Sequence, residues 1–199
     1  MKPQHYVDFT LAAPEPDTPA GKHARAQGLG TTLPAPVIAG AMLKILHGVF
    51  GQQPGRYALA LPRYPDAPFN ALRVFASERD ELDELVQGVE GHPVIRDYGH
   101  IGYPRKVPAG WDGPWREFRR YRIPSRKAGR KPDDTLRERR MARAEERRLP
   151  YFILQSRSNG QQFGLYLEVL PAETAPDDCQ PDSYGLSVAT RPFALPDLP

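Results

Sequence analysis

The chain has 199 residues, of which 40% are apolar, so it is long enough for one large domain or two small ones with buried cores. The single cysteine, Cys179, excludes an intrachain disulfide and a cysteine-based zinc site, which favours a reducing compartment. The formal net charge is +3, no apolar signal segment opens the chain, and the longest apolar stretch, 35–50, contains Lys44 and is too short to span a bilayer. We therefore expect a cytoplasmic protein with no membrane partner.

The first 110 residues carry alternating strand and helix patterns. In chain order these are a strand at 5–11, a helix at 36–50, strands at 55–62 and 70–76, a helix at 77–91 and an extended segment at 94–107. The stretch 12–36 has no periodicity and is predicted as a long loop. Ser77 is the predicted N-cap of the second helix, with Asp80 completing a loose capping box. The order β-α-β-β-α-β is typical of a ferredoxin-like unit in an α+β protein, which we assign to a first domain at 1–112.

Positive charge is concentrated in one segment, Arg116–Arg148. It carries 14 of the 27 Lys and Arg residues against 6 acidic residues, so the rest of the chain is net negative. From Asp133 onward it has no helix breaker, and a helix would place Leu136, Arg140 and Arg143 on one face. Because Arg far outnumbers Lys, and its planar fork suits phosphate, the segment predicts binding of a nucleic acid. The alternative is a solvated surface helix with Glu–Arg pairs.

A β-hairpin is predicted after the basic segment. Two β-rich runs flank Asn159-Gly160, a dipeptide that favours a tight hairpin turn. Ser156 and Ser158 would then point to one face of the incoming strand. We assign the basic segment, this hairpin and a proline-rich tail to a second domain at 113–199.

Several motifs, taken in order, resemble one protein family. They are the strand His5-Tyr-Val-Asp-Phe, the helical segment Leu43-Lys-Ile-Leu-His47, the Arg-rich helix, the hairpin SRSNGQQFGLYLEV and the later Ser183-Tyr-Gly-Leu-Ser187. The family is the CRISPR-associated endoribonuclease of the Ypest subtype, which processes type I-F precursor CRISPR RNA. The resemblance implies cleavage at the 3′ base of the repeat stem-loop without metal or cofactor, by attack of the RNA 2′-OH to give a 2′,3′-cyclic phosphate. It also implies that the protein stays bound to the mature RNA, beside other subunits of the type I-F surveillance complex.

The resemblance assigns three residues to catalysis. His47 would transfer the proton, Ser156 would hold the 2′-OH in the attacking orientation, and Tyr184 would orient the imidazole. An imidazole titrates near neutral pH, and proton transfer by such a group accelerates a reaction by roughly 10²–10⁴-fold. A lone histidine on a helix is more often structural than catalytic, so the assignment of His47 depends on the resemblance.

The resemblance also assigns RNA-binding residues. Arg122 corresponds to the arginine that reads a guanine near the base of the stem. Since Pro124 has no side-chain donor, we expect either that Ser125 or Arg126 takes the neighbouring base-reading position or that the repeat sequence differs. The other implied RNA contacts are Arg137, Arg139, Arg140, Arg143, Arg147, Ser158, Asn159 and Phe163.

Two other interpretations are open. A non-catalytic subunit that binds an RNA hairpin would keep the basic helix without turnover, and Asn159, in place of the family's usual Thr, allows this. A general RNA-binding domain of the RRM type shares the β-α-β-β-α-β order, but the chain lacks the aromatic signature of its central strand.

Overall fold

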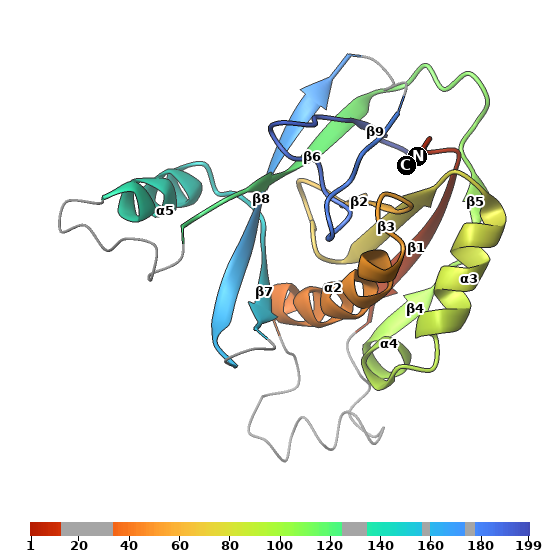
Figure 1. The fold of residues 1–199 in the computed structure, drawn as a ribbon, viewed down its shortest axis with the longest axis horizontal. Coiled ribbons are helices and arrows are strands. Elements are labelled where there is room, and N and C mark those ends of the chain that lie inside the picture. Colours follow the sequence, from red (N-terminus) through yellow and green to blue (C-terminus); the bar gives the residue numbers. More distant parts are fainter. Residues whose placement is uncertain (13–33, 125–134, 157–159, 174–177) are drawn as a thin grey trace.

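The computed structural model describes residues 1–12, 34–124, 135–156, 160–173 and 178–199 (Figure 1). Its helices are α2 (Ala35–Gln52), α3 (Arg79–Val89), α4 (Pro93–Tyr98) and α5 (Leu136–Glu146). Its strands are β1 (His5–Leu11), β2 (Ala58–Ala60), β3 (Ala71–Ala76), β4 (Gly99–Ile101), β5 (Arg105–Lys106), β6 (Trp115–Tyr121), β7 (Tyr151–Gln155), β8 (Gln162–Ala172) and β9 (Leu195–Pro196). Helices combined with antiparallel strands confirm the predicted α+β class.

The first sheet has the strand order β2-β3-β1-β4, and β5 also pairs with β1. Every pair in it is antiparallel, which is the arrangement expected of the β-α-β-β-α-β unit. The helices α2 and α3 contact each other and β1. The core beneath them is built from buried side chains of both helices and of the sheet: Val7, Phe9, Met42, Leu43, Leu46, Phe75, Leu82 and Leu85.

Helix α2 lies between the two sheets, because it packs on β1 of the first and β7 of the second. It begins with a proline in its first turn, where the missing N–H would have no helical partner in any case. By length and composition alone α2 could cross a membrane. In this fold it is a core helix whose apolar residues, spaced three or four apart, are buried: Ile38, Met42, Leu46 and Phe50.

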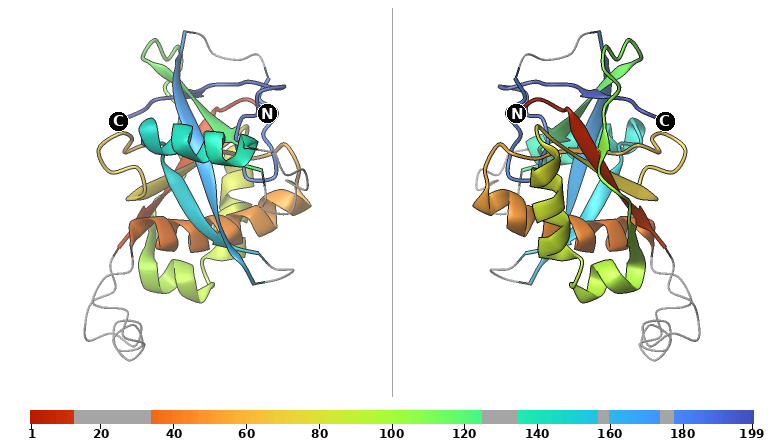
Figure 2. Two further views of the ribbon diagram at one scale, coloured as in Figure 1. Left: turned by 90° about the vertical axis from the view of Figure 1, so that its left-hand side faces the viewer. Right: turned by 90° about the vertical axis from the view of Figure 1, so that its right-hand side faces the viewer.

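The second sheet has the order β7-β8-β6-β9. The hairpin predicted around Asn159-Gly160 is formed by β7 and β8, and Gly160 has a φ of +67°, which glycine adopts readily. The proline-rich tail is part of this sheet, since Arg116 of β6 lies opposite Leu195 of β9. Helix α5 stands out from the sheet on the side away from α3, and its buried residue is Ala144 (Figures 1 and 2).

The two halves approach each other closely at Gly40 of α2. A Cβ atom at this position would lie 2.0 Å from the main-chain oxygen of Ile153 in β7, so only glycine lets the helix approach the strand this closely. Buried residues of both halves form one continuous hydrophobic cluster. The boundary between 1–112 and 113–199 stays a prediction.

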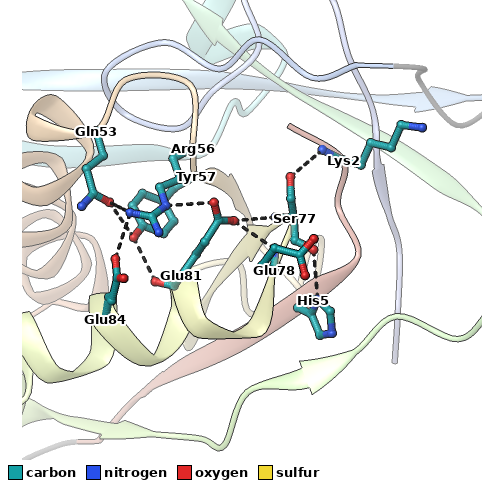
Figure 3. A network of polar contacts seen from close by, with 9 residues as sticks. All are labelled: Lys2, His5, Gln53, Arg56, Tyr57, Ser77, Glu78, Glu81 and Glu84. Atoms are coloured by element: carbon teal, nitrogen blue, oxygen red, sulfur yellow. Dashed lines mark hydrogen bonds and ion pairs between the residues drawn. The ribbon is translucent and has the colours of Figure 1, made fainter.

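The start of α3 lies one residue later than the sequence predicts. Glu78, not Ser77, is the N-cap, and Glu81, not Asp80, occupies the capping-box position. The longer Glu81 side chain reaches back to accept hydrogen bonds from the main-chain N–H groups of Ser77 and Glu78, both at 3.0 Å (Figure 3). The hydroxyl of Ser77 instead accepts a hydrogen bond from the main-chain N–H of Lys2.

Two other segments differ from the sequence prediction. The expected extended segment 94–107 begins with α4, because Pro93 starts its first turn and the His92 ring accepts a hydrogen bond from the N–H of Val94. The strand β6 is not among the predicted elements, because its arginines make it look like part of the basic segment. Its aromatic residues, Trp115, Phe118 and Tyr121, were the available signal for a strand.

Candidate functional site

His47 lies near the end of α2, and its imidazole is held by a loop more than 130 residues away. The Nδ1 atom is 2.6 Å from the main-chain oxygen of Ser183. A carbonyl oxygen only accepts hydrogen bonds, so Nδ1 carries the proton in this contact. In the neutral imidazole, Nε2 is therefore the nitrogen that can take a proton. A main-chain carbonyl thus selects the tautomer of a potential general base.

Tyr184 stacks on the same ring. The centroids of the two rings are 4.1 Å apart and their planes are 10° from parallel. Tyr184 contacts the face of the imidazole, whereas the main-chain oxygen of Ser183 is the partner of Nδ1. Burial raises the pKa of the Tyr184 hydroxyl above its ordinary value.

The loop that carries Ser183 and Tyr184 is fixed from both ends. One carboxylate oxygen of Asp182 accepts hydrogen bonds from the N–H groups of Tyr184, at 2.8 Å, and Leu186, at 3.1 Å. Gly185 between them has a φ of +77°, and its oxygen accepts a hydrogen bond from Leu59 of β2 at 2.7 Å. An Asp that accepts from the main-chain N–H two residues later is a local turn pattern, so Asp182 was the available sequence signal for this loop.

Ser156 directly follows β7, away from the helix that carries His47 in the chain. Its main chain closes the hairpin, with N–H donating to Gln161 at 2.9 Å and its oxygen accepting from Gly160 at 3.0 Å. Strand β7 meets α2 at Gly40, and His47 lies seven residues further along the helix, or about 10 Å along its axis. The structure brings Tyr184 into contact with His47, whereas Ser156 follows a strand that packs on α2 at Gly40.

Four arginines predicted to bind RNA gather at one groove of about 600 Å³ between β6 and α5. They are Arg122, Arg139, Arg140 and Arg143. The guanidinium of Arg140 donates to the main-chain oxygen of Arg122 at 2.8 Å and lies 5.4 Å from the ring centroid of Tyr121. These contacts hold the exposed end of β6 against α5, so both elements present positive charge to the same groove.

The other predicted RNA-binding residues differ in position. Arg137 donates to the main-chain oxygen of Pro124 at 2.5 Å, and Arg147 forms an ion pair with Glu168 of β8, so both have protein partners. Phe163 of β8 is 40% exposed and lines a second hollow of about 450 Å³, which also contains Arg122 and Arg140. The predicted positions Ser125, Arg126, Ser158 and Asn159 lie outside the described residues.

Two arginines of β6 that the sequence did not single out also line the larger groove: Arg119 and Arg120. Arg119 is bound through two nitrogens to the buried carboxylate of Glu117, at 2.8 and 2.6 Å, and this hydrogen bonding raises the pKa of Arg119. Arg120 lies 5.2 Å from the ring centroid of Tyr184 and 3.4 Å from Asp182. Arg120 therefore connects the basic groove to the histidine site.

The described part of the chain contains no group of three His, Cys, Asp or Glu side chains that could hold a metal ion. The arrangement combines a groove for polyanion binding with an imidazole whose free nitrogen can accept a proton. Such a groove suits an RNA backbone, and a positioned imidazole can move the proton of the 2′-OH that RNA itself carries.

Comparisons with known proteins bear on this arrangement. A solved structure of a point mutant of chlorite dismutase from Candidatus Nitrospira defluvii is similar at 11% identity over 87% of this chain and 78% of that chain, with a TM-score of 0.32, which is too low to carry an argument. The family model described as CRISPR-associated protein (Cas_Csy4) matches residues 31–196, which include α2, the basic groove, the hairpin and the Tyr184 loop. The chain therefore belongs to the Cas_Csy4 family, and its role is that of a CRISPR-associated endoribonuclease in the processing of precursor CRISPR RNA.

Proposed function

We propose that this protein is a cytoplasmic, metal-independent endoribonuclease that cuts the repeat stem-loop of precursor CRISPR RNA at its 3′ base. The observation that carries the proposal is the imidazole of His47, whose Nδ1 is held by Ser183 and whose face is covered by Tyr184. Family membership supports an RNA substrate, and the arginine groove beside this site supplies its binding surface.

The proposed reaction uses the RNA's own 2′-OH as the nucleophile. His47 Nε2 takes the proton of the 2′-OH, the 2′-oxygen attacks the adjacent phosphorus, and the bond from phosphorus to the 5′-oxygen breaks. The products are a 2′,3′-cyclic phosphate and a 5′-OH, and the leaving oxygen takes a proton from water or from the imidazolium. Ser156 would hold the 2′-OH in line with the leaving oxygen, which requires the hairpin and α2 to meet at one phosphate of the bound RNA.

The groove fits a stem recognised mainly through its phosphates. The major groove of an A-form stem is deep and narrow, so side chains generally cannot read its bases. Arg139, Arg140 and Arg143 would therefore supply affinity and salt sensitivity. Arg122, at the end of β6, would supply sequence choice at the base of the stem. We further propose that the protein keeps the cut hairpin and joins other subunits of a type I-F surveillance complex.

A cleavage assay tests the proposal. Labelled repeat RNA, identified by sequencing the RNA that co-purifies with the protein, is incubated with purified protein in EDTA. We expect a single cut at the 3′ base of the stem, a cyclic-phosphate end and complete inhibition by one 2′-deoxy substitution at the cut. Binding without cleavage would instead assign the protein to the non-catalytic class of hairpin-binding subunits.

A further inference from the structure

Arg120 lies where the basic groove meets the histidine site. Its side chain lines both the 600 Å³ groove and the 450 Å³ hollow beside it. Its guanidinium carbon is 5.2 Å from the ring centroid of Tyr184, which in turn is 4.1 Å from that of His47. These two distances together place the guanidinium carbon no more than 9.3 Å from the centre of the imidazole. A phosphate in contact with Arg120 would therefore lie near the Tyr184 ring, which stacks on the imidazole of His47.

The guanidinium of Arg120 has capacity for a further anionic partner. Its described ion pair is a single contact of 3.4 Å with one oxygen of Asp182, whereas an Arg side chain has five N–H donors. The other oxygen of Asp182 already accepts two main-chain hydrogen bonds from its own loop. The Arg120 side chain is 28% exposed, so a phosphate in the groove can reach it without any rearrangement of the core.

The neighbouring Arg119 shows the contrasting case. It lines the same groove, but its guanidinium makes two short hydrogen bonds to Glu117, which also accepts one from the buried hydroxyl of Ser187. Such a bidentate pair largely neutralises the charge of the arginine. Of these two adjacent arginines, Arg120 has the weaker carboxylate contact, so more of its positive charge is available to an RNA phosphate.

We infer that Arg120 is a phosphate-binding residue that holds one backbone phosphate of the RNA beside the imidazole of His47. The inference depends on the proposed function, because it takes the occupant of the groove to be the repeat hairpin. Positive charge near the phosphate also stabilises the negative charge that builds on its oxygens during the attack. A purely structural Arg120 would only support the Tyr184 loop and would contact no phosphate.

A binding cycle between protein and RNA separates these roles. The wild-type protein and Arg120→Gln are each titrated with uncleavable 2′-deoxy repeat hairpins, in which an uncharged methylphosphonate replaces one phosphate at a time around the cut. Arg120→Gln should weaken binding of the unmodified hairpin by about tenfold, as expected for one charge-assisted hydrogen bond. At one methylphosphonate position the wild type should lose the same amount and the variant should lose nothing more.

Two further variants serve as controls. Arg96→Gln removes one charge from α4, on the opposite side of the molecule from α5, and should leave the pattern of methylphosphonate effects unchanged (Figure 1). Arg120→Lys keeps a positive charge and should restore most of the position-specific loss. If Arg120→Gln lost as much affinity as the wild type at every methylphosphonate position, the phosphate contact would be overturned. If the wild type bound no repeat hairpin, the proposed function would fail and this inference with it, whereas binding with additive losses overturns only the inference.

The Asp182→Asn variant decides the question if Arg120→Gln does not fold. Its amide oxygen can still accept the two main-chain hydrogen bonds of the loop, while the negative charge beside Arg120 is removed. Binding of the unmodified hairpin should become about two- to fivefold tighter, because Arg120 is freed from a partly exposed ion pair. Unchanged or weaker binding would count against Arg120 as a phosphate ligand.

Discussion

The aromatic ring of Tyr184 stacks on the imidazole of His47 at 4.1 Å, and the residue before it, Ser183, holds Nδ1 through its main-chain oxygen. One loop therefore fixes the plane, the face and the tautomer of the histidine. This arrangement separates the contribution of the tyrosine ring from that of its hydroxyl, and each can be tested by substitution.

The imidazole itself is the first target. His47→Ala should lower the single-turnover cleavage rate of repeat RNA by roughly 10²–10⁴-fold, the range of proton transfer by a positioned side chain. The affinity for the hairpin should change little, because the groove arginines are untouched. Cleavage by this variant at the wild-type rate would remove the proposed mechanism.

Replacing Tyr184 distinguishes stacking from hydrogen bonding. Tyr184→Phe keeps the ring and should cleave at close to the wild-type rate, since a main-chain oxygen already holds Nδ1 of His47. Tyr184→Leu removes the stack and should lower the rate by about two- to tenfold, because an aromatic pair contributes about 0.5–1.5 kcal/mol. A severe loss in the Phe variant alone would show that the hydroxyl acts directly in the reaction.

The groove arginines should control the salt dependence of RNA binding. The double variant Arg139→Gln with Arg143→Gln should reduce the slope of log K against log salt by about two, one for each lost phosphate contact. The control is Arg79→Gln with Arg96→Gln, which removes two exposed arginines from α3 and α4. Equal slopes in the two double variants would mean that α5 does not bind the phosphates.

The close contact between α2 and β7 should contribute to the free energy of unfolding of the whole molecule. Gly40→Ala would place a methyl group 2.0 Å from the oxygen of Ile153, so we expect a loss of about 1–3 kcal/mol in the free energy of unfolding. Gly88→Ala in α3 is the matched control, because nothing lies within 4 Å of its Cβ position. It should gain about 0.5–1 kcal/mol from the lower entropy of the unfolded chain. Denaturant titrations of both variants measure the difference, and similar values would show that α2 and β7 can separate freely.

The stability of the fold should fall at alkaline pH. Burial raises the pKa of Tyr57 from 10.0 to about 12, and its hydroxyl lies 2.9 Å from both Gln53 Oε1 and the main-chain oxygen of Glu81 (Figure 3). The native state keeps this proton where the unfolded chain releases it, so the contribution is complete below pH 10 and is lost as the pH rises towards 12. Burial of Cys179, which raises its pKa from 9.0 to about 12, adds a loss of the same sign that starts near pH 9.

Substitution assigns this alkaline loss to its source. Tyr57→Phe should flatten part of the fall in melting temperature between pH 10 and 12. Tyr103→Phe, at a side chain that is 87% exposed, should leave the curve as it is. If the two variants gave the same pH profile, the alkaline loss would have to come from other groups.

The features that depend on local patterns could be predicted from the sequence. Period-two and period-four apolar spacing located β1, α2, β3 and α3, and the turn chemistry of Asn159-Gly160 located the hairpin. Clustered arginines located the basic surface, because charge density along the chain is visible without a fold. At β6 the aromatic residues favour a strand and the arginines favour a basic surface segment, so the strand could not be predicted from the sequence.

Which groups meet across the molecule depends on long-range packing. Ser183 and His47 are 136 residues apart, Arg120 and Asp182 are 62 apart, and the oxygen of Ile153 faces Gly40 only because a helix from one half packs on a strand from the other. Every residue has a main-chain oxygen, so no sequence motif can predict that the one of Ser183 will bind an imidazole. Contacts of this kind are set by how the two sheets enclose α2, and periodicity along a single segment cannot specify that packing.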